Sequence, residues 1–123
     1  MEEGRFNSNQ LFSQLVANSL FTPKQVAIIY NRMRGGGRLP GMTSGAYFRQ
    51  VKQCQDKVQA VLYTAVLLQS TDVLDAQSLA ALGQLSEQLR VIFARDARDI
   101  LPPDRTESVM SVMSQVIKRV SRL

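Results

Sequence analysis

Residues 44–70 read SGAYFRQVKQCQDKVQAVLYTAVLLQS, and the spacing of their apolar side chains decides the fold class. Apolar residues recur there at alternating intervals of four and three, at positions 47, 51, 54, 58, 61, 65 and 68. This spacing places them on one side of an α-helix. No proline interrupts the segment. We therefore expect one long helix that begins after Thr43 or Ser44 and spans about 39 Å if it is unbroken.

The two halves of this predicted helix differ in polarity. From Val58 to Thr71 the chain has no charged residue, so we expect the second half to be buried on most sides. In the first half, Tyr47, Val51 and Cys54 define the inner side. The residues that fall on the opposite, exposed side are Gly45, Arg49, Lys52, Gln53 and Asp56.

Two shorter helices are expected before it. The first runs from Asn7 or Ser8 to about Ser19, with Leu11, Phe12, Leu15 and Val16 on one face. The second begins at Thr22, since Thr is a good N-cap, Pro23 suits the first helical position and Gln25 completes a capping box. Gly35 is expected to end it. The predicted inner face of this second helix comprises Val26, Ile29, Tyr30 and Met33.

Two more helices are expected after it. Asp72 or Asp75 begins a fourth helix, and the segment Ile100-Leu101-Pro102-Pro103-Asp104 ends it. Its apolar stripe comprises Leu79, Leu82, Leu85, Leu89 and Ile92, and that of the last helix comprises Val109, Met113, Val116, Val120 and Leu123. Such stripes form either an intramolecular core or a dimer seam.

No segment has the sustained alternation of a strand. The prediction is therefore an all-α fold of about five helices in a single domain, residues 1–123. Within it, residues 72–123 form a helical core or dimerisation segment.

Composition narrows the possible functions. The 123 residues are 45% hydrophobic and 20% charged, which is ordinary for a globular chain. No apolar run is long enough to span a membrane, and the N-terminal MEEGRFNSNQ lacks the apolar core of a signal peptide. One cysteine fits a reducing compartment, so we expect a cytoplasmic protein. With no His and one Cys, we expect no metal, no cofactor and no enzymatic activity.

The positive charge is concentrated in one third of the chain. The net charge is +5, yet residues 24–57 alone carry seven basic residues against Asp56. Residues 58–101 carry three arginines against five acidic residues. A polyanion is therefore the expected partner of residues 24–57.

Residues 21–58 contain two motifs in the order of a known DNA-binding element. Phe21, Thr22, Lys24 and Gln25 open one helix, and Met42, Thr43, Arg49 and Val58 mark the next. This arrangement resembles the helix-turn-helix of bacterial sigma-factor C-terminal domains and related response regulators, with a shortened turn. The resemblance implies a DNA-binding segment at 21–58 in a transcriptional regulator.

The glycine-rich segment between these helices is not a nucleotide cradle. A P-loop requires Lys and then Ser or Thr after its last glycine, whereas Gly41 is followed by Met42. We expect Gly35–Gly41 to form a flexible turn whose Arg34 and Arg38 contact phosphates.

The site prediction follows from the exposed side of the 44–70 helix. Arginine and glutamine can pair with guanine and adenine edges in the major groove of double-stranded DNA. The residues expected to read bases are Arg49, Lys52 and Gln53, and those expected to contact the backbone are Lys24, Arg32, Arg34, Arg38, Ser44 and Lys57. The favoured function is a homodimeric transcriptional regulator.

Two alternatives stay open. The same basic face, with Phe48 stacked on unpaired bases, suits a sequence-independent chromosome-coating protein or a binder of single-stranded DNA or RNA. A helical adaptor that docks an acidic protein is the other alternative.

Overall fold

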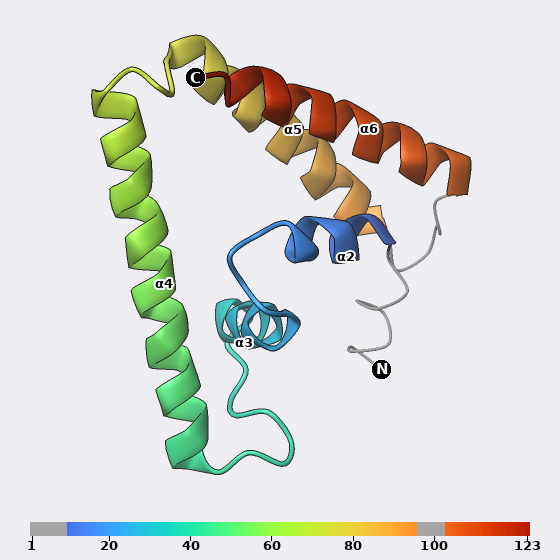
Figure 1. Cartoon of the computed structure of the whole chain (residues 1–123). Coiled ribbons are helices and arrows are strands. Elements are labelled where there is room, and N and C mark those ends of the chain that lie inside the picture. The colour runs from blue at the N-terminus through green and yellow to red at the C-terminus, as the bar shows by residue number, and fades with distance from the viewer. Residues whose placement is uncertain (1–9, 96–102) are drawn as a thin grey trace. The chain divides into compact units, whose positions relative to one another are not determined.

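The computed structural model describes residues 10–95 and 103–123, and over these residues it is helical with no strand (Figure 1). The all-α prediction is therefore confirmed. The expected helix start at Asn7 or Ser8 and the segment Ile100–Pro102 lie outside the described residues. The described helices are α2 (Gln10–Ala17), α3 (Pro23–Met33), α4 (Ser44–Ser70), α5 (Ala76–Arg95) and α6 (Pro103–Val120).

The chain divides into two compact units. One comprises residues 15–64, with α3 and most of α4. The other comprises the first residues of α2, the end of α4, and helices α5 and α6. Since α4 is a single continuous helix, the relative directions of side chains along it are fixed by helical geometry.

The start of α3 forms the predicted capping box. The backbone N–H of Gln25 donates to Thr22 Oγ1 over 3.1 Å, and the backbone N–H of Thr22 donates to Gln25 Oε1 over 3.0 Å. Pro23 occupies the first helical position. Helix α3 ends at Met33, and Gly35 follows with a φ of 74°, a conformation that favours glycine.

Thr22→Ala is expected to lower the free energy of unfolding by about 1 kcal/mol, because it removes the acceptor for the Gln25 N–H. Thr64→Ala is the matched control, since Thr64 lies exposed inside α4 and its hydroxyl only donates to Ala60 O. Alanine favours a helix interior, so the control should be neutral or slightly stabilising. Urea unfolding followed by far-UV circular dichroism measures both, and equal losses would contradict the capping role.

The core of the 15–64 unit lies between α3 and α4. Ile28, Tyr47, Val51 and Cys54 are buried together, and Ile29, Leu39 and Met42 pack against them. The Tyr47 hydroxyl donates to Asn31 Oδ1 over 3.2 Å, which satisfies the polar end of a side chain that is only 1% exposed. Loop residues therefore complete a core that two helices begin.

The predicted inner face of α3 is partly wrong. Its most buried residue is Ile28, which the stripe of Val26, Ile29, Tyr30 and Met33 omits. Met33 is 83% exposed, because it is the last residue of α3 and the cluster packed on that helix centres on Ile28. Periodicity identifies an amphipathic helix more reliably than it identifies which residue the neighbouring helix covers.

Helix α4 confirms the predicted length but not the predicted burial. Thr43 caps it, since the Ala46 N–H donates to Thr43 Oγ1 over 3.1 Å. The first half buries Tyr47, Val51 and Cys54 as expected. The expectation that the second half is buried on most sides is wrong: the exposed fractions are 59% for Leu62, 78% for Tyr63, 64% for Val66 and 59% for Leu67. The absence of charge predicted burial, but the described residues leave this side of α4 uncovered.

The second unit is built around α5 and α6, which are in contact with each other. Of the two predicted caps, Asp75 begins α5, since its Oδ1 accepts from the Ser78 N–H over 2.8 Å, which also lowers the pKa of the Asp75 carboxyl. Leu85 and Leu89 are buried, and the rings of Phe12 and Phe93 meet edge to face at 5.1 Å between centroids. Four of the five stripe residues of the last predicted helix are half-buried: Val109, Met113, Val116 and Val120.

Candidate nucleic-acid interface

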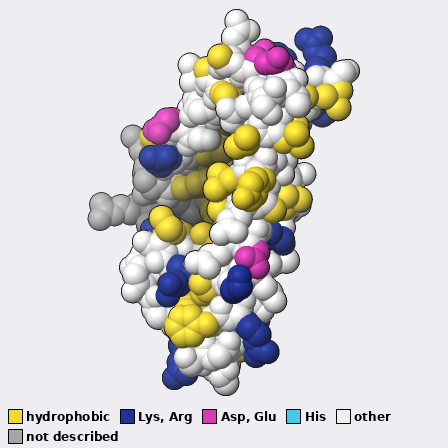
Figure 2. Space-filling model, turned by 90° about the vertical axis from the view of Figure 1, so that its left-hand side faces the viewer, with side chains coloured by type: hydrophobic (Ala, Val, Ile, Leu, Met, Phe, Trp, Pro, Cys, Tyr) yellow, Lys and Arg dark blue, Asp and Glu magenta, His cyan; other side chains and the backbone are white. Residues whose placement is uncertain are grey.

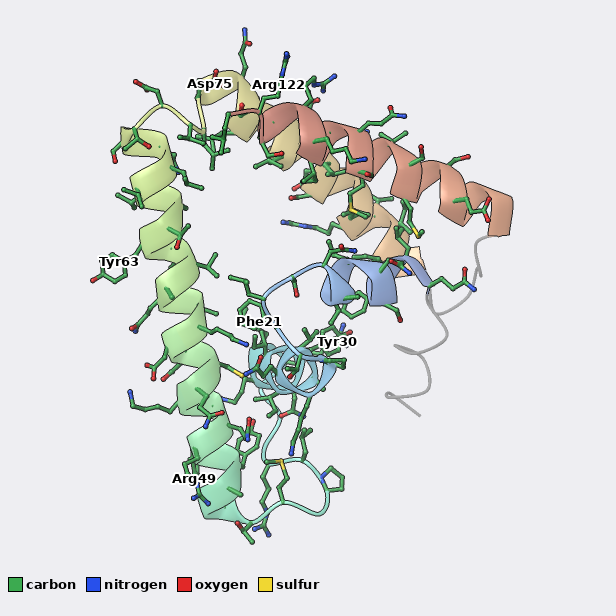
Figure 3. The ribbon with its side chains drawn as sticks, viewed as in Figure 1. Phe21, Tyr30, Arg49, Tyr63, Asp75 and Arg122 are labelled. Atoms are coloured by element: carbon green, nitrogen blue, oxygen red, sulfur yellow. The ribbon has the colours of Figure 1, made fainter. Side chains whose placement is uncertain are left out.

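The predicted base-reading residues lie on one exposed face of the first half of α4. Arg49, Lys52 and Gln53 are all exposed, while the buried side of the same turns carries Tyr47 and Val51. In Figure 3, Arg49 projects away from α4 near the end of the helix that adjoins the turn. The core thus fixes the helix from one side and leaves the polar side chains free on the other.

Lys52 has an internal partner that a phosphate can replace. Its Nζ lies 3.3 Å from Asp56 Oδ1, one helical turn away, and the two side chains are 74% and 59% exposed. Pairs of this kind in a helix contribute only about 0.3–0.5 kcal/mol. Exchanging Asp56 for a phosphate or a base edge therefore costs little.

Phe48 lies next to these residues and is 57% exposed. Its ring meets the buried Tyr47 ring edge to face at 5.7 Å between centroids, which holds it in place. An exposed aromatic ring beside Arg49 is the feature that the single-strand alternative requires.

The segment between α3 and α4 is tied down at both ends. The N–H groups of Gly35 and Gly36 donate to Arg32 O and Asn31 O over 3.0 and 2.9 Å, and Leu39 and Met42 pack on the core. We therefore expect this turn to be less mobile than its glycine content suggests.

Gly36→Ala is expected to lower the free energy of unfolding by about 1–3 kcal/mol through overpacking. A Cβ at this position would meet the Asn31 side chain at 2.6–2.9 Å, and Asn31 also accepts from Tyr47. Gly37→Ala is the matched control, because a Cβ there meets nothing within 4 Å. Thermal unfolding of both variants tests this, and an equally stable Gly36→Ala would show that the turn yields freely.

The predicted backbone-contact residues separate into two groups. Arg32, Arg34, Arg38 and Ser44 lie at the turn and are exposed, with the Arg34 guanidinium carbon 4.0 Å from the centroid of the Tyr30 ring. Lys24 is exposed at the other end of α3, about 16 Å along a helix of 11 residues.

Lys57 is half-buried and occupied within the protein. Its Nζ donates to Gln25 Oε1 over 2.8 Å and lies 5.6 Å from the centroid of the Phe21 ring. The structure therefore gathers the turn-side residues near Arg49 but leaves Lys24 and Lys57 apart. Figure 2 shows Lys and Arg side chains over the lower part of the view, and hydrophobic side chains over its middle.

Cys54 is a core residue rather than a reactive group. It is 4% exposed, and its Sγ lies 3.7 Å from Gln25 O. Burial raises the pKa of the Cys54 thiol above its ordinary 9.0, while the charge of Lys57 acts in the opposite direction. Less thiolate forms near neutral pH, and the thiol is the less nucleophilic form.

Cys54 is therefore expected to react with iodoacetamide much more slowly in the folded chain than in urea at the same pH, by at least about tenfold. Mass spectrometry follows the modification over time. Equal rates in the two conditions would contradict the burial of this residue.

Sequence reasoning missed Asn31, which joins the turn to the core through Tyr47 and Gly36. Nothing in its local sequence marks this role, because both partners depend on the folded turn. Among the described residues, no group of His, Cys, Asp and Glu could hold a metal ion. None of the helices in residues 10–95 and 103–123 has the length and apolar character that crossing a bilayer requires.

Comparisons with protein-family models, with curated proteins and with solved structures give no match for this chain. A functional interpretation therefore depends on the residues and geometry of the site.

Proposed function

We propose that the chain binds double-stranded DNA and regulates transcription, presenting the first half of α4 to the major groove. The observation that carries this proposal is the exposure of Arg49, Lys52 and Gln53 on one face of a capped helix. Tyr47, Val51 and Cys54 anchor the opposite face in the core. Arg and Gln can make bidentate contacts to guanine and adenine at base edges.

The neighbouring turn supports the same interpretation. Exposed Arg34 and Arg38 stand next to α4 in sequence and supply positive charge where a groove-bound helix brings the phosphate backbone close. In Figure 1, α3 is seen nearly end-on while α4 runs along the view, so the two helices cross steeply, as in a helix-turn-helix. The connection, residues 34–43, is longer than the usual turn of that motif.

A second candidate function is binding of single-stranded DNA or RNA. Phe48 favours it, because an exposed ring beside Arg49 offers a surface on which a base can stack. The two candidates differ in the nucleic acid that they prefer, so one experiment separates them.

Fluorescence anisotropy with random-sequence duplex DNA, single-stranded DNA and RNA, over a range of salt concentrations, tests the proposal. Duplex DNA is expected to bind most tightly, with a log–log salt slope of about −0.9 per phosphate contact. A preference for single strands would favour the second candidate. No binding of any nucleic acid at low salt would contradict both and favour an acidic protein partner.

A further inference from the structure

The second half of α4 carries an exposed apolar face. Leu62, Tyr63, Val66 and Leu67 lie on one side of the helix, because they are spaced by one, three and four residues. Each is more than half exposed, and Tyr63 projects away from α4 in Figure 3. The segment 58–71 contains no charged residue.

The size of this face is that of an interface rather than of scattered surface residues. Together with Val58 and Val61, which are 39% and 36% exposed, it presents about 600 Å² of apolar surface, the upper end for the largest patch of a typical monomer. Two such faces packed on each other would bury about 1,200 Å², the lower limit for a specific protein interface.

We infer that the occupant of this face is a second copy of the chain, packed antiparallel along α4 about a two-fold axis. An uncharged face is complementary to itself, since two copies meet with no like-charge repulsion, and a two-fold interface uses the same patch on both subunits. An acidic or basic partner would find no opposite charge there.

The position of the face along α4 gives a second argument, which rests on the proposed function. The centre of the face lies about 13 residues beyond the centre of Arg49, Lys52 and Gln53, or about 20 Å along the helix. An antiparallel pair therefore holds the two base-reading faces about 40 Å apart, close to the 34–36 Å between half-sites one DNA turn apart. Those residues are turned about 60° around α4 from the apolar face, so the partner leaves them uncovered.

Sedimentation velocity of the full chain over a range of micromolar concentrations tests this inference. The wild-type chain is expected to be dimeric, and Leu62→Glu with Val66→Glu is expected to be monomeric at every concentration, because two charges per copy enter an apolar seam. Tyr63→Lys is a second disrupting variant. Far-UV circular dichroism checks that each variant keeps its helices.

The matched controls are Val91→Glu on α5 and Val112→Glu on α6, whose native side chains are 53% and 50% exposed. Both should stay dimeric. A monomeric wild-type chain would overturn the inference, as would a dimer that Val112→Glu dissociates while the α4 variants do not. A dimer that binds no DNA would instead contradict the proposed function and leave the α4 seam standing.

Discussion

Arg49→Glu combined with Lys52→Glu is expected to weaken duplex DNA binding by at least about 100-fold at moderate salt. Each side chain is proposed to contact a base edge or phosphate worth about 1–3 kcal/mol, and the reversal adds repulsion from the DNA. Both side chains are exposed, and the Lys52–Asp56 pair is weak, so the fold should be unaffected. Fluorescence anisotropy measures the affinity, and circular dichroism measures the helix content.

The control for this prediction is Arg90→Glu combined with Lys118→Glu. It makes the same change in net charge on exposed positions of α5 and α6, away from the proposed interface. We expect it to weaken binding several-fold, through the long-range field alone. If both double variants lose affinity equally, the binding depends on net charge and α4 presents no specific face.

Tyr47→Ala is expected to lower the free energy of unfolding by about 3–5 kcal/mol, as truncation of a fully buried aromatic side chain commonly does. Tyr47 is 1% exposed and forms one core with Ile28 and Val51. Since small domains are stable by only about 5–15 kcal/mol, this variant should be partly unfolded at room temperature or close to it. Chemical denaturation followed by circular dichroism measures the loss.

Two further variants separate the contributions of Tyr47. Tyr47→Phe keeps the ring but removes the hydrogen bond to Asn31, so it should cost about 1 kcal/mol. Tyr63→Ala removes the same side chain type from the exposed part of α4 and should be close to neutral in the monomer. A large loss in Tyr63→Ala and a small one in Tyr47→Ala would place the core on the wrong side of α4.

Local sequence signals predicted the helices well. The Thr22–Gln25 capping box, the glycine at position 35 and the length of α4 depend on residues close in sequence, and the structure confirms each of them. The exposure of Arg49, Lys52 and Gln53 was predicted for the same reason, since helical periodicity relates them to the core stripe of one helix.

Features that depend on tertiary packing were not predictable. The burial of Ile28 rather than Met33 reflects which part of α3 meets Tyr47 and the loop residues that pack with it. The exposed face of the second half of α4 was missed because hydrophobicity alone does not say whether the same chain or another covers a surface. The internal partners of Lys57 come from α3, 32 residues earlier in the case of Gln25.

The most direct measurement is the change in ¹H–¹⁵N NMR spectra of the ¹⁵N-labelled chain when a random-sequence duplex is added. A chain of 13.7 kDa is well suited to it. The account predicts that the shifted amides concentrate at residues 44–53 and in the turn around Arg34 and Arg38. Shifts confined to α5 and α6, or an unchanged spectrum at low salt, would contradict the claim that the first half of α4 binds DNA.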